Sequence, residues 1–161
     1  MPGHRSQRKV RVPQLPDSPL EDVSTRRIVA VDRVSIAREE DVLSARTSAA
    51  TLAEALGMQR NDVIAVVTAI SELATNIVKY ARKGELRLAR VALDERWGLV
   101  VVARDDGPGI ADIEAAMRDG FSTGGSLGFG LAGARRLMDE FAIESALGLG
   151  TTVTMTKWVR R

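Results

Sequence analysis

Glycine residues gather in two short clusters in the second half of the 161-residue chain. Eight of the fourteen glycines fall between Gly107 and Gly133, and six of these lie within the segments 105–109 and 124–130. A chain retains glycine where φ must be positive or where a ligand approaches the backbone. Successive N–H groups that lead into a helix at Leu131 would form a nest for an anion at the positive end of that helix. The second cluster therefore predicts a phosphate site.

The spacing of these glycines matches neither of two common nucleotide-binding motifs. No Lys-Ser or Lys-Thr pair follows the glycines, as a Walker loop requires, and no predicted strand comes directly before Gly125, as the dinucleotide fingerprint requires. A lone Gly-x-Gly is most often a flexible surface loop, but two clusters this close together weaken that interpretation. Another nucleotide-binding fold is required.

Asp105 opens the first cluster, Asp-Asp-Gly-Pro-Gly, directly after the apolar segment 99–104. An ionised carboxylate only accepts hydrogen bonds, so Asp105 would select an amine such as the exocyclic N6 of adenine. An aspartate is equally common as the first residue of a β-turn, and the residues themselves leave both roles open. Asp106 competes for the same role, but its side chain is expected to point the opposite way.

Glu72 and Asn76 lie four residues apart on a predicted helix, 61–80, and therefore on one face of it. Both lie away from the apolar stripe of that helix, and periodicity alone favours an ordinary solvated face. A functional role requires a site at that edge, where Asn76 offers an oxygen to Mg²⁺ and Glu72 offers a base for an attacking hydroxyl. Lys79, on a neighbouring flank, would reach a phosphate.

The composition excludes several other kinds of chemistry. The chain has no cysteine, which removes disulfides and thiolate sites and fits a reducing, cytoplasmic location. Its one histidine is His4, in the Pro-rich leader, so imidazole catalysis is not expected. The excess positive charge lies in that leader, which argues against nucleic-acid binding by the body. No apolar run of about 20 residues is apparent, and we expect no membrane insertion.

The pattern of apolar residues predicts one α+β domain, 27–161, behind a basic, disordered leader, 1–26. Short turns between neighbouring strands predict a two-layer sandwich, with a mixed, mostly antiparallel sheet and helices on one face. The expected helices are 39–56, 61–80, 112–119 and 131–141, with Asn61 or Asp62 as the cap of the second. The expected strands are 28–34, 85–93, 99–104, 142–145 and 151–158.

Four ordered segments together resemble the N, G1, G2 and G3 boxes of the GHKL ATPases. They are Glu72-x-x-x-Asn76, Asp105-x-Gly-Pro-Gly109, Gly125-x-x-Gly128-x-Gly130 and Gly150-Thr151. The resemblance implies a Bergerat fold in which Asp105 binds adenine, Asn76 holds Mg²⁺ and Glu72 is the catalytic base. It also implies a lid over the phosphates and support of the adenine by Thr151. The nucleotide-binding residues expected on this basis are Asn76, Lys79, Asp105, Gly107, Gly109, Gly125, Ser126, Leu127, Gly128, Phe129, Gly130, Leu131 and Thr151.

Within this superfamily the chain is most similar to the small serine-protein kinases of the RsbT type, over about residues 26–161. The stretches 70–77, 119–131, 136–141 and 150–153 carry the similarity, together with Lys157-Trp158. It implies transfer of the ATP γ-phosphate to a serine of a STAS-domain antagonist in a stressosome pathway. The kinase would then activate a PP2C-type phosphatase on release.

Two other functions stay open. The first is an anti-sigma factor, or partner switch, that acts mainly by ATP-gated binding. The second is a detached histidine-kinase catalytic domain. A homodimer is compatible with each of them. Phe129 departs from the family pattern, which often has a small residue at that lid position, and the leader has no counterpart in it.

Overall fold

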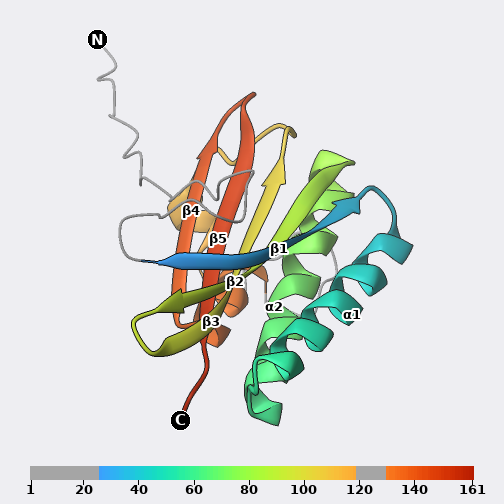
Figure 1. Cartoon of the computed structure of the whole chain (residues 1–161). Coiled ribbons are helices and arrows are strands. Elements are labelled where there is room, and N and C mark those ends of the chain that lie inside the picture. Colours follow the sequence, from blue (N-terminus) through green and yellow to red (C-terminus); the bar gives the residue numbers. More distant parts are fainter. Residues whose placement is uncertain (1–25, 119–129) are drawn as a thin grey trace.

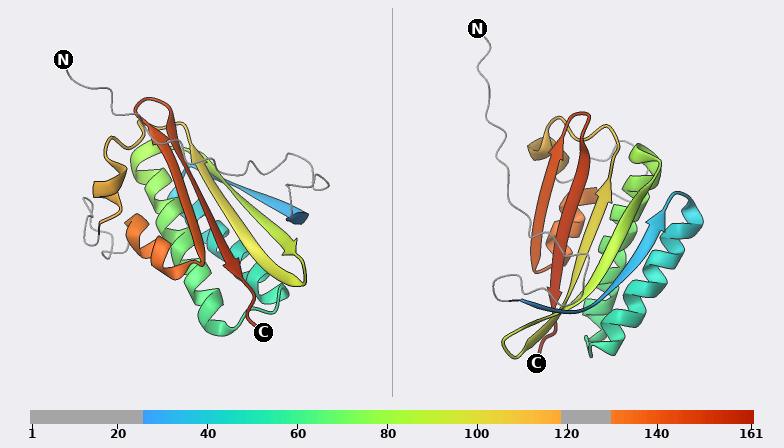
Figure 2. Two further views of the ribbon diagram at one scale, coloured as in Figure 1. Left: turned by 90° about the vertical axis from the view of Figure 1, so that its left-hand side faces the viewer. Right: turned by 45° about the horizontal axis from the view of Figure 1, so that its top comes forward.

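Five strands form one antiparallel sheet in the order β1-β2-β3-β5-β4, and helices cover one of its faces (Figure 1). This computed structural model describes residues 26–118 and 130–161. The expected α+β sandwich is confirmed, and every strand pair among the described residues is antiparallel. Figure 2 shows the sheet as one layer and the helices as the other. The elements are β1 (Arg27–Ile36), α1 (Glu39–Ala55), α2 (Arg60–Asn76), η1 (Ile77–Ala81), β2 (Gly84–Leu93), β3 (Arg96–Asp105), α3 (Ile113–Ala116), α4 (Gly130–Leu137), β4 (Glu140–Ala146) and β5 (Gly150–Trp158).

Helix α1 packs on its neighbours through a stripe of alanines. Ala45, Ala49 and Ala53 recur every fourth residue and are fully buried, so that the narrow stripe lets the backbones approach closely. At the start of α1, the carboxylate of Asp41 accepts hydrogen bonds from the backbone N–H groups of Ala37 (2.8 Å) and Arg38 (2.9 Å). These bonds lower the pKa of Asp41 and stabilise the first turn of the helix.

Helix α2 is the core helix of the domain and packs against α1, α4 and the sheet. Its buried face includes Val66, Ile70 and Leu73. The stretch Arg60–Ala81, which joins α2 to η1, is long and apolar enough by length and composition to cross a membrane, contrary to the expectation from the sequence. Core helices of soluble proteins reach the same length and composition, and this stretch packs against α1, α4 and the sheet.

Each face of the sheet carries its own apolar cluster. On the helix side, Leu86, Leu88, Leu99, Val101 and Met155 join the main core. The other face holds a smaller cluster around Ile28, Ala89, Val91, Val100 and Trp158. Two guanidinium groups cover the Trp158 ring, with Arg26 Cζ at 5.2 Å and Arg96 Cζ at 4.7 Å from its centroid. The two arginine side chains thus shield the Trp158 ring of this cluster on the face of the sheet opposite the helices.

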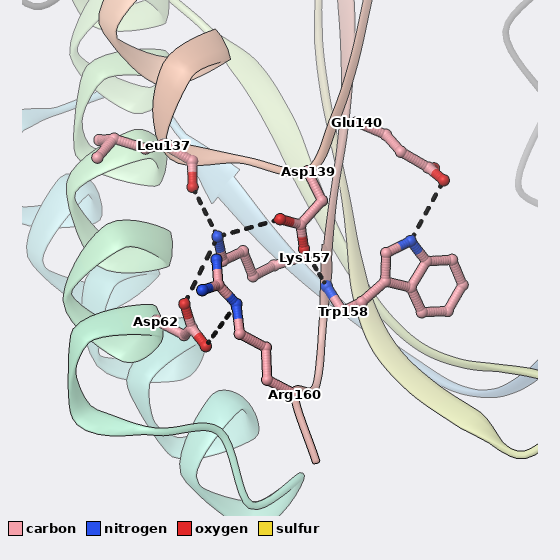
Figure 3. A network of polar contacts seen from close by, with 7 residues as sticks. All are labelled: Asp62, Leu137, Asp139, Glu140, Lys157, Trp158 and Arg160. Atoms are coloured by element: carbon pink, nitrogen blue, oxygen red, sulfur yellow. Dashed lines mark hydrogen bonds and ion pairs between the residues drawn. The ribbon is translucent and has the colours of Figure 1, made fainter.

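A buried ion network joins α2, α4 and β5 at one end of the domain (Figure 3). The side chain of Lys157 is only 5% exposed. Its Nζ donates to the carbonyl of Leu137 (3.0 Å) and to Asp139 Oδ1 (3.3 Å), and it lies 3.6 Å from Asp62 Oδ1. Arg160 Nε lies 3.6 Å from the other oxygen of Asp62. The lysine charge thus has partners on both helices, as burial of a charge requires.

This network corrects the expected cap of α2. The N-cap is Gln59, without a side-chain hydrogen bond, and Asp62 lies inside the first turn. Its carboxylate is 8% exposed and is directed to Lys157 and Arg160. The carboxylate of Asp62 therefore contacts Lys157 and Arg160 instead of capping the backbone N–H groups of α2.

The expected helix 131–141 is also too long. Helix α4 ends at Leu137, and Phe141 belongs to β4. The backbone N–H of Asp139 donates to the carbonyl of Thr156 (2.9 Å), while its carboxylate accepts from the N–H of Trp158 (2.7 Å). Pairing with β5 therefore ends the helix although the apolar spacing continues. The helix expected at 112–119 is likewise a single turn, α3, capped by Asp112 Oδ1, which accepts from Ala115 N (3.0 Å).

Candidate functional site

Asp105, Thr151 and Ser145 form a row across three neighbouring strands. Asp105 on β3 pairs with Thr151 on β5, which in turn pairs with Ser145 on β4. Directly paired residues of antiparallel strands project from the same face of a sheet. On the other side of Asp105 the row continues through Gly84 to Ile36, which is buried in the main core. The row therefore faces the helical layer.

The Asp-Gly-Pro-Gly segment turns back tightly after Asp105. Asp105 Oδ1 accepts a hydrogen bond from the N–H of Gly107 (2.9 Å), which fixes the carboxylate at the start of the turn. Gly109 has φ +74°, and a side chain there would collide with the backbone carbonyl of Ala146. Gly150 has φ +83° and lies as closely against the carbonyl of Asp105. The glycines thus allow the turn to pack against the tip of the β4–β5 hairpin.

The end of α2 lies against the same turn. A Cβ on Gly84 would stand 3.0 Å from Ile77 Cγ2 and 3.2 Å from Asp105 Cβ, and a Cβ on Gly107 would stand 2.7 Å from Ala81 Cβ. These close approaches place η1 directly beside the end of β3. The structure therefore brings the Asp105 turn and the end of the helix that carries Glu72 and Asn76 to one end of the domain.

Glu72 and Asn76 are both half-buried near the end of α2. Among the described residues, Glu72 Oε2 is buried and has no hydrogen-bond partner. A buried carboxylate oxygen without a partner is costly and calls for an explanation, such as a catalytic role or a bound water or ion. This burial overturns the view that periodicity favoured, in which Glu72 lies on an ordinary solvated face.

The helix changes its winding directly after Asn76. Residues Ile77–Ala81 form a π-turn, and Arg82 follows with φ +69°. A π-turn places more residues in each turn, so the α-helical projection that put Lys79 on a neighbouring flank does not apply. Lys79 is exposed at this position.

The start of α4 is the described part of the second glycine cluster. Gly130 opens the helix with φ +45°, and Leu131 is buried at 9% exposure. Because the Leu131 side chain packs in the core, only its backbone N–H is suited to bind a ligand. Helix α4 packs against α2. The expected ligands Gly125, Ser126, Leu127, Gly128 and Phe129 lie outside the described residues, as does the leader before Arg26.

Ser145 is a site residue that the sequence did not indicate. Its hydroxyl contacts Thr151 Oγ1 (2.8 Å) and the carbonyl of Gly150 (3.0 Å), and it accepts from the N–H of Ile110 (2.8 Å). It therefore ties the end of the Asp-Gly-Pro-Gly turn to the start of β5. A serine in a short predicted strand carries no local signal of this role. Only its pairing with Thr151 reveals it.

Comparison with known proteins adds to this geometry. Residues 36–157 match the family described as "Histidine kinase-like ATPase domain", which spans the described sheet and helices from the end of β1 to Lys157. The chain belongs to this ATPase family. The family resemblance inferred from the four sequence boxes is therefore confirmed.

The relatives of this ATPase domain include two kinds of protein. Serine/threonine-protein kinase RsbT of Bacillus subtilis is 47% identical over 127 residues, which cover 79% of this chain and 96% of RsbT. An anti-sigma F factor of Caldanaerobacter subterraneus is 31% identical over 132 residues, or 78% of this chain and 91% of that protein. The relatives thus include both a kinase and a sigma-factor antagonist.

A solved structure supports the fold. The RsbU and RsbW domains of a Mycobacterium tuberculosis protein align with a TM-score of 0.56 and 22% identity. The alignment covers 82% of the ATPase domain chain but 33% of that longer protein. At this identity the match shows the fold alone.

Proposed function

We propose that the protein is an ATP-dependent serine-protein kinase of a partner-switching pathway. The observation that carries the proposal is the convergence of Asp105 and the helix bearing Glu72 and Asn76 at one end of a histidine kinase-like ATPase domain. The 47% identity to serine/threonine-protein kinase RsbT, over nearly all of that protein, supports transfer to a protein hydroxyl.

Asp105 and Thr151 would bind the purine of ATP. Asp105 already uses one carboxylate oxygen to accept from Gly107, which sets the orientation of the second oxygen. An oriented carboxylate favours an exocyclic amine over a carbonyl, because it only accepts hydrogen bonds. The phosphates would extend along α2 toward the start of α4, where the N–H of Leu131 lies at the positive end of the helix.

The residues near the end of α2 fit a magnesium ion. Mg²⁺ prefers oxygen ligands, and the Asn76 carboxamide provides one on the same face as the unpartnered Glu72 Oε2. When bound, Mg²⁺ neutralises charge on the β- and γ-phosphates. Asn76 would hold the ion, while Glu72 stays available as a base.

In the transfer step, Glu72 would receive the proton of the substrate serine. The serine oxygen forms a bond to the γ-phosphorus as the bond between that phosphorus and the β–γ bridging oxygen breaks, and ADP leaves with the electron pair. The buried Oε2 of Glu72 is the carboxylate oxygen that would accept this proton. Exposed Lys79 would attract the phosphates from the rim of the site.

The protein substrate we propose is a STAS-domain antagonist, and a PP2C-type phosphatase is the target activated on release. The partner-switching context agrees with the similarity to RsbT and to anti-sigma F factors. We further propose that the protein acts in the cytoplasm with ATP and Mg²⁺, and that it does not bind nucleic acid.

A second candidate is an ATP-gated binding switch. The 31% identity to an anti-sigma F factor favours it, because the name of that protein describes control of a sigma factor. In such a switch the nucleotide organises a docking surface, and phosphoryl transfer is not the output. Both functions use the same purine site.

The deciding experiment incubates the full chain with Mg-ATP and a STAS-domain protein encoded nearby, followed by mass spectrometry of both proteins. We expect one added phosphate on a serine of the STAS protein. Phosphate on a histidine, labile to acid, would indicate a histidine kinase instead. Bound ATP without transfer to any STAS candidate would contradict the kinase and favour the binding switch.

A further inference from the structure

The hydroxyl of Ser145 has contacts that account for all of its hydrogen-bonding capacity. A serine hydroxyl donates one hydrogen bond and accepts two. The N–H of Ile110, at 2.8 Å, can only donate to it, and the carbonyl of Gly150, at 3.0 Å, can only accept from it. The remaining contact, 2.8 Å to Thr151 Oγ1, can form in either direction by distance alone.

Only one direction makes all three contacts hydrogen bonds. Ser145 spends its single proton on the Gly150 carbonyl, so Thr151 must donate its own proton to Ser145. The Thr151 oxygen is then left with lone pairs only, and it acts as an acceptor toward anything else it meets. The Asp105 carboxylate is an acceptor in any case, and it faces the same side of the sheet as Thr151. The two neighbouring side chains therefore both present acceptors.

We propose that Ser145 is a positioning residue that makes the purine end of the site select an amine over a carbonyl at C6. This rests on the proposed function, in which Asp105 and Thr151 bind the purine. Ser145 acts through Thr151, because it fixes the direction of the threonine hydroxyl. A ligand with donors at C6 meets two acceptors, whereas a carbonyl there places lone pairs against lone pairs.

Without Ser145, the threonine hydroxyl is free to rotate. It can then donate to a carbonyl ligand, so the site loses part of its rejection of the wrong base. The hydrogen bonds through which Ser145 links Ile110 to β5 are lost as well. This second effect should weaken the binding of all nucleotides alike. The ratio of two affinities separates the two effects, because only the direction of the Thr151 hydroxyl distinguishes the ligands.

The test compares ATP with inosine triphosphate, which differs from ATP in carrying a carbonyl at C6 and a proton at N1. Affinities for both are measured by calorimetry with the full-length wild type and with Ser145→Ala. We expect the preference for ATP to fall about three- to tenfold in the variant, as one neutral hydrogen bond allows. A parallel loss of both affinities with an unchanged ratio would show a purely structural role and overturn the proposal.

Three further variants sharpen the test. Ser145→Thr keeps the hydroxyl and should retain most of the preference, and Ser35→Ala, at an exposed position on β1, should retain all of it. Thr151→Val removes the hydroxyl that Ser145 orients, so its preference should fall as well, and adding Ser145→Ala should not lower it further. A further fall in the double variant would contradict the proposed route through Thr151, and if Ser145→Ala does not fold, an unchanged preference in Thr151→Val overturns the proposal.

Failure of the proposed function has a different signature. A folded wild type that binds neither nucleotide would refute the purine site itself, and the assignment of Ser145 with it. A wild type that prefers ATP, together with an unchanged ratio in Ser145→Ala, would refute only the role of Ser145.

Discussion

Gly107 lies directly against Ala81, so the turn that follows Asp105 rests on the π-turn that ends α2. A Cβ on Gly107 would stand 2.7 Å from Ala81 Cβ and 2.8 Å from Ala81 Cα. The φ of Gly107 is outside the left-handed region, so the requirement for glycine comes from this contact and not from backbone conformation. One contact thus couples the proposed purine site to the helix with the proposed base.

Gly107→Ala should force these two turns apart. We expect a loss of about 1–3 kcal/mol in the free energy of unfolding, as is typical of overpacking, together with weaker ATP binding. Thermal unfolding and calorimetry measure the two effects, and Gly107→Val should be worse than Gly107→Ala in both. Unchanged ATP affinity in a folded Gly107→Ala protein would show that the contact does not position the site.

Asp105→Asn should weaken ATP binding by about 2 kcal/mol or more. The substitution replaces an acceptor oxygen by an amide donor, which would face the amine of adenine. Asp106→Asn is the matched control, because Asp106 is the exposed neighbour in the same turn. Calorimetry should place Asp106→Asn near the wild type. Equal affinities of Asp105→Asn and the wild type would remove Asp105 from the site.

Glu72→Gln should separate nucleotide binding from phosphoryl transfer. The amide has the shape of the carboxylate but cannot accept the serine proton, so we expect a loss of at least about 100-fold in transfer rate with ATP affinity retained. Glu54→Gln, at an exposed position on α1, is the control. Control of the downstream partner that survives in Glu72→Gln would favour the binding switch over the kinase.

Lys157→Met should destabilise the domain without touching the proposed site. Removing this buried cation leaves Asp62 with only the exposed Arg160 and Asp139 with only the N–H of Trp158, and breaking a buried ion pair costs up to about 3–5 kcal/mol. Arg160→Met is the control, and it should cost less than about 1 kcal/mol because that side chain is 62% exposed. Chemical denaturation measures both.

A second variant tests the physical cause of that loss. Adding Asp62→Leu to Lys157→Met should recover part of the stability, because it removes a buried carboxylate that has lost Lys157 and keeps only the exposed Arg160 as partner. If the double variant is as unstable as the sum of the single ones, the loss of stability does not come from the buried charge of Asp62.

Glu140→Gln should change the acid stability of the domain. Burial by itself raises the pKa of Glu140, but the hydrogen bonds from Trp158 and Arg26 outweigh burial and hold it below the ordinary value of 4.5. A carboxyl with a lowered pKa contributes stability above its unfolded pKa and loses it as the pH falls through the folded pKa. The wild type should therefore lose more stability below about pH 4.5 than Glu140→Gln. Parallel melting curves of the two proteins across this range would contradict the role of Glu140.

Local patterns in the sequence were enough to predict the sheet-and-helix architecture and most of the elements. Alternation and apolar spacing report the burial of neighbouring residues, and this burial is a local property of each strand or helix. The spacing of Glu72 and Asn76 places both on one helical face for the same reason, and the Asp-Gly-Pro-Gly motif predicts a tight turn after Asp105. The roles of these residues as ligands of ATP and Mg²⁺ stay predictions.

Only the tertiary structure decided the contacts between distant segments. The β4–β5 hairpin brings Ser145 to Thr151, and the Asp-Gly-Pro-Gly turn brings the N–H of Ile110 to the same hydroxyl from a distant part of the chain. Pairing of Asp139 with β5 ends α4 at Leu137 where the apolar spacing would continue it. Asp62, which the sequence suggested as a cap of α2, pairs instead with the buried Lys157. Apart from the pairing of Ser145 with Thr151, each of these contacts joins residues that are far apart in the sequence. They form only when the helices and turns pack on the sheet, so local patterns cannot predict them.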